Sequence, residues 1–451
     1  MKHSDELRLL DEALATLAGG FSDLPDVDTA PDMEALRPVL IETAQRMTDN
    51  YPYFHPLYAG QMLKPPHPVA RIAYALSLWV NPNNHALDGG RASSAMEKDC
   101  VSHLAAMVGW NTHLGHLTSG GTMANLEALW VSDRLHPGKR VLASSQSHYT
   151  HGRISDVLKI PFAAVPCAAD GAMDLNALED ELKRGDVGTV VVTLGTTGIG
   201  AVDPLDAILA LRERYGVRIH VDAAYGGYFT LSGVLSDPVR ARYDALSQVD
   251  SIVIDPHKHG LQPYGCGCIL FSDPSVGRFY QHDSAYTYFS SDELHLGEIS
   301  LECSRAGAAA VALWATQRLL PSVPGGDFAA MLDDCILTAR DFVDGLTHSE
   351  HYVNLFEPML DIAVYSRRGD DGHGISAANQ RIFDEAAASQ DLHLALMNLD
   401  HASVATQLGL PPEGDAVSCL RSVFMKAEQR GYVSEILERL DAVAVTSGQR
   451  P

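Results

Sequence analysis

The first group of residues that could do chemistry is the turn Ser119-Gly120-Gly121-Thr122. It follows the end of an apolar run and precedes a helical pattern at Met123–Arg134. Glycines in such a turn expose backbone N–H groups, and the N-terminal end of the helix adds a partial positive charge. The turn can therefore bind a phosphate group, whereas an ordinary capped helix start is the simpler interpretation of this motif by itself.

Two further segments each place a charged side chain at the end of an apolar run. Asp222 follows the run 217–221, and Lys258 lies in the turn DPHKHG after the run 252–254. An acid at the carboxyl end of a parallel strand points into the ligand crevice of an open α/β sheet. A lysine buried in such a place becomes nucleophilic. Singly, a helix-capping aspartate and a solvated surface lysine remain the alternatives.

Together, the three segments supply the groups that pyridoxal phosphate requires. The glycine turn would hold the phosphate, Asp222 would keep the pyridine nitrogen protonated, and Lys258 would form the Schiff base. No GxGxxG opens a helix after a strand, and GxxxxGK[ST] does not occur, so a dinucleotide or nucleoside triphosphate is not indicated. The combination predicts an enzyme that uses pyridoxal phosphate.

The sequence resembles the pyridoxal-phosphate-dependent group II amino-acid decarboxylases, which include the glutamate, tyrosine and aromatic amino-acid decarboxylases. Seven segments carry the resemblance in the family's order: TSGGT (118–122), SHYTHGR (147–153), TLGTTGIGAVDP (193–204), HVDAAYGG (220–227), DPHKHG (255–260), ECSRAG (302–307) and LRSVFM (420–425). The resemblance implies an α/β fold of the aspartate-aminotransferase type (fold type I). It also implies a homodimer whose active sites lie at the subunit interface.

The resemblance assigns five residues to the cofactor's ring. Lys258 would be the Schiff-base lysine, and Asp222 would pair with the pyridine nitrogen. Ala224 would pack beneath the ring, and His148 would stack on its other face. Thr196 would form a hydrogen bond near Asp222 or the ring.

Other residues are assigned to the phosphate and the substrate. Ser119-Gly120-Gly121 would hold the phosphate, and His257 would lie beside the lysine, near phosphate or substrate. Arg421 matches a position that approaches a substrate carboxylate in some members of the family. Asn84 and His85 belong to a polar, Gly-rich loop that either reaches the active site or forms a plain turn.

The resemblance implies decarboxylation of an L-amino acid to the amine and carbon dioxide, the reaction of a carboxy-lyase. Many members return a proton to Cα from a tyrosine on a loop after the lysine strand. Tyr286 and Tyr288 are the candidates here, together with His257. A lyase, an oxidative deaminase or an aminotransferase would use the same carbanion chemistry. A silent relative with a binding or regulatory role is disfavoured by the retained lysine, aspartate and histidine.

Alternating strands and helices must position these residues. Runs such as TVVVTL (189–194) are apolar without alternation, which is typical of strands covered on both faces. The predicted strands of this kind are 141–143, 162–165, 189–194, 217–221, 252–254 and 268–271. Because helical patterns separate several of them, a mostly parallel sheet is predicted.

Three regions are predicted along the chain. Residues 1–80 form a helical N-terminal dimerisation segment, with amphipathic helices at 1–20 and Met33–Met47. Residues 81–322 form the large domain that binds the cofactor, and 323–451 form a smaller C-terminal α/β domain. The Pro- and Gly-rich stretch PSVPGG marks the boundary between the last two regions.

Composition restricts the partners. The 451 residues carry 33 basic and 57 acidic side chains, a formal net charge of −24 that repels nucleic acid and anionic membranes. Seven scattered cysteines do not suggest a disulfide framework, which favours a cytoplasmic location, and no closed set of metal ligands is recognisable. The longest apolar stretch, 306–315, is too short to span a membrane, which takes about 20 residues.

Overall fold

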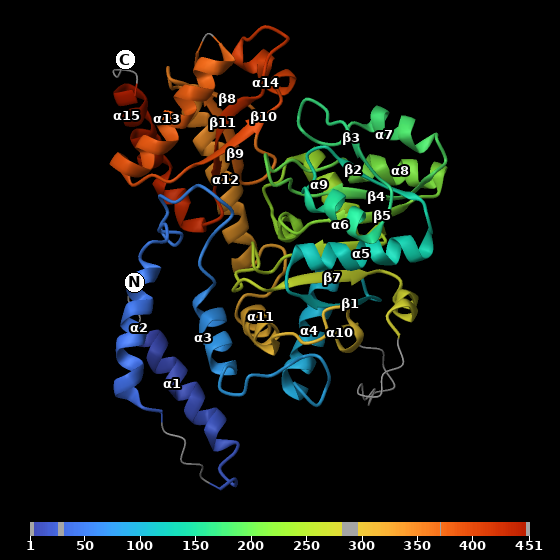
Figure 1. Cartoon of the computed structure of the whole chain (residues 1–451), viewed down its shortest axis with the longest axis vertical. Coiled ribbons are helices and arrows are strands. Elements are labelled where there is room, and N and C mark those ends of the chain that lie inside the picture. Colours follow the sequence, from blue (N-terminus) through green and yellow to red (C-terminus); the bar gives the residue numbers. More distant parts are fainter. Residues whose placement is uncertain (1–3, 26–30, 282–295, 370, 448–451) are drawn as a thin grey trace.

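The computed structural model describes residues 4–25, 31–281, 296–369 and 371–447, and a seven-stranded sheet forms its centre (Figure 1). Its strands are β1 (Leu114–Thr118), β2 (Arg140–Ser144), β3 (Phe162–Val165), β4 (Val187–Thr193), β5 (Arg218–Asp222), β6 (Ser251–Ile254) and β7 (Gly267–Phe271). The strand order is β1-β7-β6-β5-β4-β2-β3. Strand β7 pairs antiparallel with β1 and β6, whereas the pairs among β2 to β6 are parallel. The predicted mostly parallel sheet is confirmed.

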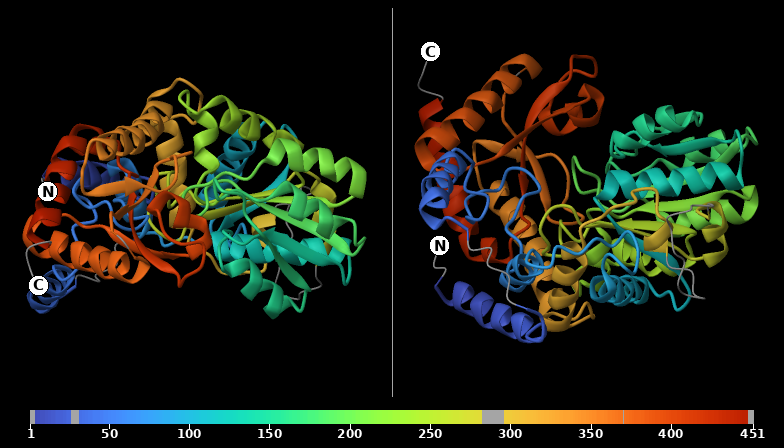
Figure 2. Two further views of the ribbon diagram at one scale, coloured as in Figure 1. Left: turned by 90° about the horizontal axis from the view of Figure 1, so that it is seen from above. Right: turned by 60° about the horizontal axis from the view of Figure 1, so that its bottom comes forward.

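Helices cover both faces of this sheet, which explains why its strands read as apolar runs without alternation. Helices α5 (Gly121–Leu135) and α6 (Thr150–Leu158) lie on one face, and α8 (Leu205–Tyr215) and α9 (Asp237–Asp244) lie on the other (Figure 2). Strand β4 is buried from its second residue to its last. The remaining helices of this part are α4 (Arg91–Met107), α7 (Leu175–Leu182), α10 (Leu296–Ile299) and α11 (Gly307–Leu319).

A second, four-stranded sheet lies in the C-terminal part of the chain. Its strands are β8 (Tyr352–Asn354), β9 (Ile362–Arg367), β10 (Ala395–Leu399) and β11 (Val417–Val423), all antiparallel in the order β10-β11-β9-β8. The accompanying helices are α12 (Asp327–Thr347), α13 (Gly372–Gln390), α14 (His401–Leu408) and α15 (Val433–Ser447). Apolar residues of this sheet, such as Ile362, join the same buried cluster as Leu194 after β4. The boundary at 322 stays a prediction.

The N-terminal helices are α1 (Ser4–Gly19), α2 (Met33–Met47) and α3 (Pro68–Ser77), and the first two lie at one edge of the molecule (Figure 1). None of the residues of α1 and α2 is buried. Their exposed apolar side chains include Leu7, Leu36, Val39, Leu40 and Ile41. Among the described helices, none has the length and apolarity needed to cross a lipid bilayer.

Candidate active site

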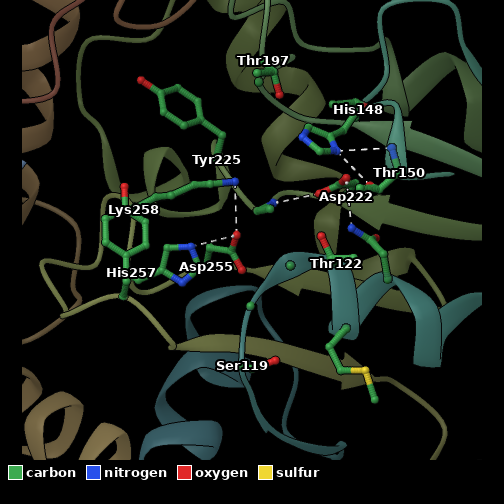
Figure 3. Close-up of a pocket in the computed structure, with 18 of the residues that line it drawn as sticks. Ser119, Thr122, His148, Thr150, Thr197, Asp222, Tyr225, Asp255, His257 and Lys258 are labelled. Carbon is green, nitrogen blue, oxygen red and sulfur yellow. Dashed lines mark hydrogen bonds and ion pairs between the residues drawn. The ribbon is translucent and has the colours of Figure 1, made fainter. Parts of the chain in front are cut away.

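A cavity of about 460 Å³ lies at the edge of the large sheet where the parallel strands have their carboxyl ends (Figure 3). Strands β1, β4, β5 and β6 all contribute residues from their last position or from the turn that follows. The lining consists of Ser119, Gly120, Gly121, Thr122, Met123, Asn125, His148, Thr150, Thr193, Gly195, Thr197, Asp222, Ala224, Tyr225, Asp255, His257, Lys258, Tyr264 and Gly265. The three segments singled out in the sequence therefore meet at one cavity, as the topology of a parallel sheet requires.

Asp222, the last residue of β5, is held by three hydrogen bonds. His151 Nε2 lies 2.8 Å from its Oδ2, Asn125 Nδ2 donates to the same oxygen over 3.2 Å, and the backbone N–H of Ala224 donates to Oδ1 over 3.1 Å. Burial by itself raises the pKa of this carboxyl. The hydrogen bond from His151 and the positive charge of Lys258 outweigh burial and hold the pKa of Asp222 well below its usual range. The residue is therefore an anion at neutral pH.

A network of buried side chains determines which atom of Asn125 donates the hydrogen bond to Asp222. Burial lowers the pKa of His220 to about 3, so this imidazole is neutral. His220 Nε2 lies 2.8 Å from Asn125 Oδ1, and its Nδ1 lies 2.9 Å from the hydroxyl of Ser251. Since an amide oxygen only accepts, His220 donates through Nε2 and accepts from Ser251 through Nδ1. Ser251 therefore donates to His220, His220 donates to Asn125, and Asn125 donates to Asp222.

Lys258 faces the cavity from the turn after β6. Its Nζ lies 3.1 Å from Oδ2 of Asp255, which is almost fully buried, and its backbone N–H donates to the carbonyl of Asp255. His257 lies alongside: its Nδ1 donates to the carbonyl of Cys266 over 2.8 Å, and its Nε2 is 3.5 Å from the same Asp255 oxygen. Burial lowers the pKa of His257. Figure 3 shows the lysine and Asp222 reaching into the same space.

His148 lines the cavity just before α6. Its Nδ1 lies 2.8 Å from the hydroxyl of Thr150, and its ring lies 4.4 Å from the ring of Tyr149, measured between centroids. Burial lowers the pKa of His148, which favours the neutral imidazole. Ala224 lines the cavity as well and presents only a methyl group. The two residues expected against the faces of a flat ring are therefore both present at the cavity.

The glycine turn leaves space that side chains would fill. Gly120 has a φ of +156°, and it immediately precedes α5. A Cβ on Gly121 would lie 2.8 Å from Asp255 Oδ2, closer than real Cβ atoms come to such a neighbour, and 3.2 Å from Ala224 Cβ, which is a tight contact. The first backbone N–H groups of a helix have no intrahelical partner and favour an anion. One N–H of the turn, that of Ser119, donates to the carboxylate of Glu302 over 2.9 Å.

This donor set fits pyridoxal phosphate. An anionic aspartate for the pyridine nitrogen, a lysine for the aldehyde and a helix N-terminus for the phosphate surround one cavity. The tight approach at Gly121 keeps the turn free of side chains where the phosphate would bind. The cofactor expected from the sequence is thus matched by the residues that the structure brings together.

Several residues singled out in the sequence do not line the cavity. Thr196 is fully buried, and its hydroxyl accepts the N–H of Ala201 over 3.0 Å, whereas the adjacent Thr197 lines the cavity. Asn84 is buried, and its amide lies 2.6 Å from a carboxylate oxygen of Glu97. His85 lies 3.4 Å from the thiol of Cys303. Tyr286 and Tyr288 fall outside the described residues. All these assignments stay predictions.

Arg421 lies on β11 and is not among the residues that line the cavity. Its Nη1 donates to Gln61 Oε1 over 3.2 Å, while Nε and Nη2 are buried and have no hydrogen-bond partner among the described residues. A second arginine, Arg305, has a structural role, because its Nη1 lies 2.8 Å from buried Glu97. Tyr225, a lining residue, donates to Asp361, whose charge acts on Arg421.

The side chains of the site that sequence reasoning missed include Asn125, His151, Asp255 and Tyr225. Asp255 and His151 stood inside the motifs that carried the resemblance, two or three positions from the residues that were chosen. Asn125 follows the glycine turn by one helical turn, so helical spacing could have placed it on the same side of α5. Tyr225 follows Ala224 in HVDAAYGG.

Comparison with known proteins identifies the family. Residues 130–365 match the model of the pyridoxal-dependent decarboxylase conserved domain. An L-2,4-diaminobutyrate decarboxylase of Acinetobacter baumannii is 27% identical over 399 residues, covering 79% of this chain and 76% of that protein. A probable L-tyrosine/L-aspartate decarboxylase of Methanoculleus marisnigri is 30% identical over 310 residues, covering 68% of this chain and 80% of that protein.

A solved structure agrees on the fold. The structure of Oryza sativa TDC with PLP and tryptamine superposes with a TM-score of 0.79 at 16% identity, and the match covers 98% of both chains. The fold is therefore that of the fold type I enzymes predicted from the sequence. Because the family model matches more than half of this chain, the chain belongs to the family of pyridoxal-phosphate-dependent amino-acid decarboxylases.

Proposed function

We propose that this chain decarboxylates an L-amino acid with Lys258 as the lysine that binds the cofactor and Asp222 as the partner of the pyridine nitrogen. The observation that carries the proposal is their placement: both side chains line one cavity, at whose edge Gly120 and Gly121 lead into α5. An amine for the aldehyde, an acid for the ring and N–H groups for the phosphate are the three contacts that this cofactor needs.

The residues around the cavity would have separate roles in the reaction. When bound, pyridoxal phosphate draws electrons from a substrate bond at Cα. Asp222 would keep a proton on the pyridine nitrogen, and His148 and Ala224, which line the cavity, would hold the ring between them. Asp255 holds the ammonium of Lys258 toward the cavity at 3.1 Å. The proton that returns to Cα would come from His257, Tyr286 or Tyr288.

The test begins with Lys258→Ala, which should abolish turnover while the protein stays folded. Borohydride reduction of the wild-type holoenzyme should fix the cofactor to the peptide that contains Lys258, as detected by mass spectrometry. The exposed Lys183 serves as the matched control, and its alanine variant should behave as the wild type. Normal turnover by the Lys258 variant, or cofactor fixed to another lysine, would contradict the assignment.

Product analysis separates decarboxylation from the other outcomes of the same chemistry. Carbon dioxide and the amine in equal amounts are expected from an amino acid. Ammonia with a carbonyl compound would indicate oxidative deamination, and an amino group passed to a keto acid would indicate transamination. Aspartate, tyrosine and 2,4-diaminobutyrate are the first substrates to try, because relatives carry these names.

Arg421 is proposed to bind a carboxylate of the substrate. Two of its buried nitrogen atoms have no partner in the described parts of the chain, and a buried guanidinium left in this state is costly. A carboxylate that accepts both N–H groups would remove that cost, since arginine binds carboxylates in a two-pronged geometry. Lys in its place could not form the same pair.

A cytoplasmic homodimer is proposed as the working form. All seven cysteines are free, which suits a reducing compartment. Helices α1 and α2 expose apolar side chains that a second copy of the chain would cover, and we propose that the active sites lie at that interface.

A further inference from the structure

His151 is a buried histidine that does not line the cavity but contacts a residue that does. It lies on α6, three positions after His148, and no part of it is exposed. Its Nε2 lies 2.8 Å from Asp222 Oδ2. Any effect of His151 on the cofactor must therefore pass through Asp222.

The surroundings of His151 decide which nitrogen carries the proton. Nδ1 is buried and has no hydrogen-bond partner among the described residues. A doubly protonated ring would bury an unpaired, charged N–H group, which is far more costly than an unpaired lone pair. The geometry therefore places a proton on Nε2, which donates to the carboxylate of Asp222.

The bonds on Asp222 are distributed unevenly between its two oxygens. Oδ2 accepts from both His151 and Asn125, whereas Oδ1 accepts one backbone N–H, from Ala224. Each carboxylate oxygen has two lone pairs, so Oδ2 is saturated and Oδ1 keeps one. Other ionisable groups near this carboxylate are Lys258 and His148, which line the cavity, and the neutral His220 behind Asn125.

We propose that His151 is a positioning residue that orients Asp222 toward the cofactor and keeps the proton on the pyridine nitrogen rather than on the carboxylate. The donor at Oδ2 leaves the free lone pair on Oδ1 for the ring. It also spreads the carboxylate's negative charge, which makes Asp222 a weaker base than the nitrogen that it faces. The proposal rests on the role of Asp222 in the proposed function.

The test follows the protonation of the ring nitrogen directly. Wild type and variants are loaded with pyridoxal phosphate labelled with ¹⁵N in the ring, and the nitrogen chemical shift is recorded against pH. In His151→Leu the proton-binding constant of the ring nitrogen should fall roughly tenfold or more, since a hydrogen bond to a charged group is lost. His151→Gln keeps a side-chain N–H donor and should restore at least part of the wild-type titration.

A matched control comes from a second buried histidine. His116 Nε2 lies 2.8 Å from Glu127 Oε2 outside the cavity, and both side chains are fully buried. His116→Leu removes the same kind of bond, so it should lower stability without moving the titration of the ring nitrogen. A similar shift in both leucine variants would mean that general loosening of the fold is responsible, and would overturn the proposal.

Two more arms separate the possible failures. Asp222→Asn should remove the proton from the ring nitrogen; if it does not, the role of Asp222 fails, and the proposal falls with it. If Asp222→Asn loses the ring proton but His151→Leu titrates as the wild type, the proposal for His151 is wrong and the role of Asp222 stands. If His151→Leu does not bind the cofactor, the wild-type protein is labelled with ¹⁵N in its histidine rings and studied by nitrogen NMR. Comparison with His151→Gln assigns the signals of His151, and these signals show which ring nitrogen carries the proton. A His151 ring protonated on Nδ1 would overturn the proposal.

Discussion

At the scale of single residues, the site is organised around one anion. The donors from His151, Asn125 and the backbone of Ala224 all point to Asp222. A buried carboxylate without such donors would take up a proton and become neutral. The hydrogen bonds therefore allow Asp222 to remain an anion that can pair with a protonated pyridine ring.

Replacing Asp222 by Asn tests this charge with little change of shape. The amide cannot stabilise a protonated ring nitrogen, so the rate should fall on the order of 10³-fold or more. Steady-state kinetics at saturating cofactor measures the effect, and thermal unfolding serves as the control for the fold. A variant within a few-fold of the wild type would show that the pyridine nitrogen has another partner.

Arg421→Lys tests the proposed contact with the substrate. The lysine keeps the positive charge but loses the two-pronged geometry, so KM should rise about tenfold or more while kcat changes less. Kinetics with the best substrate from the product screen provides the measurement. An unchanged KM in a stable variant would indicate that Arg421 has a purely structural role.

At the scale of elements, the ends of strands and the start of one helix bring the site together. Lys258 follows β6, Asp222 ends β5, and the glycine turn follows β1. Since these strands are parallel to one another in the sheet, their carboxyl ends lie at one edge. Helix α5 begins at the same edge, because the glycine turn lets the chain enter it directly from β1.

Gly121→Ala tests how closely the glycine turn must approach its neighbours. The added Cβ would lie 2.8 Å from Asp255 Oδ2, so either the turn or the aspartate must move. Cofactor affinity should fall about tenfold or more, as measured by equilibrium titration of the apoenzyme. Gly431→Ala is the control, because a Cβ there meets nothing within 4 Å. Equal affinity in the two variants would show that the turn does not bind the phosphate.

At the scale of the whole molecule, helices α1 and α2 have exposed apolar surface and no buried residue of their own. Val39, Leu40 and Ile41 of α2 are each more than half exposed. So much apolar surface is unusual on a monomer and typical of an interface. Each active site would then depend on the neighbouring chain.

Deleting residues 1–50 should convert the dimer into monomers or aggregates and lower cofactor occupancy, as sedimentation and absorbance can measure. Because a deletion could also disturb folding, a second variant carries Val39→Glu and Leu40→Glu. These side chains are 60% and 61% exposed, so their replacement should leave the fold of one chain intact. A fully active dimer in both variants would place the interface elsewhere.

Local patterns were sufficient to predict most of the fold. The apolar runs predicted six strands of the large sheet, and the helix predicted at Met33–Met47 is found at those residues. Helix α11 begins only at Gly307, because the residues just before it, 302–305, are held by Ser119, Asn83 and Glu97. Such tertiary contacts leave no periodic signal in the sequence.

The sequence by itself determined the chemistry of this protein, because a glycine turn, an acid and a lysine at strand ends require only residue type and order. The tertiary structure alone decided which partners those residues have. His151, Asn125 and His220 act on Asp222 across three elements, and Asp255 meets Lys258 through a turn. Hydrogen bonds depend on distances of a few ångströms between segments far apart in the chain, and spacing along a sequence does not contain those distances.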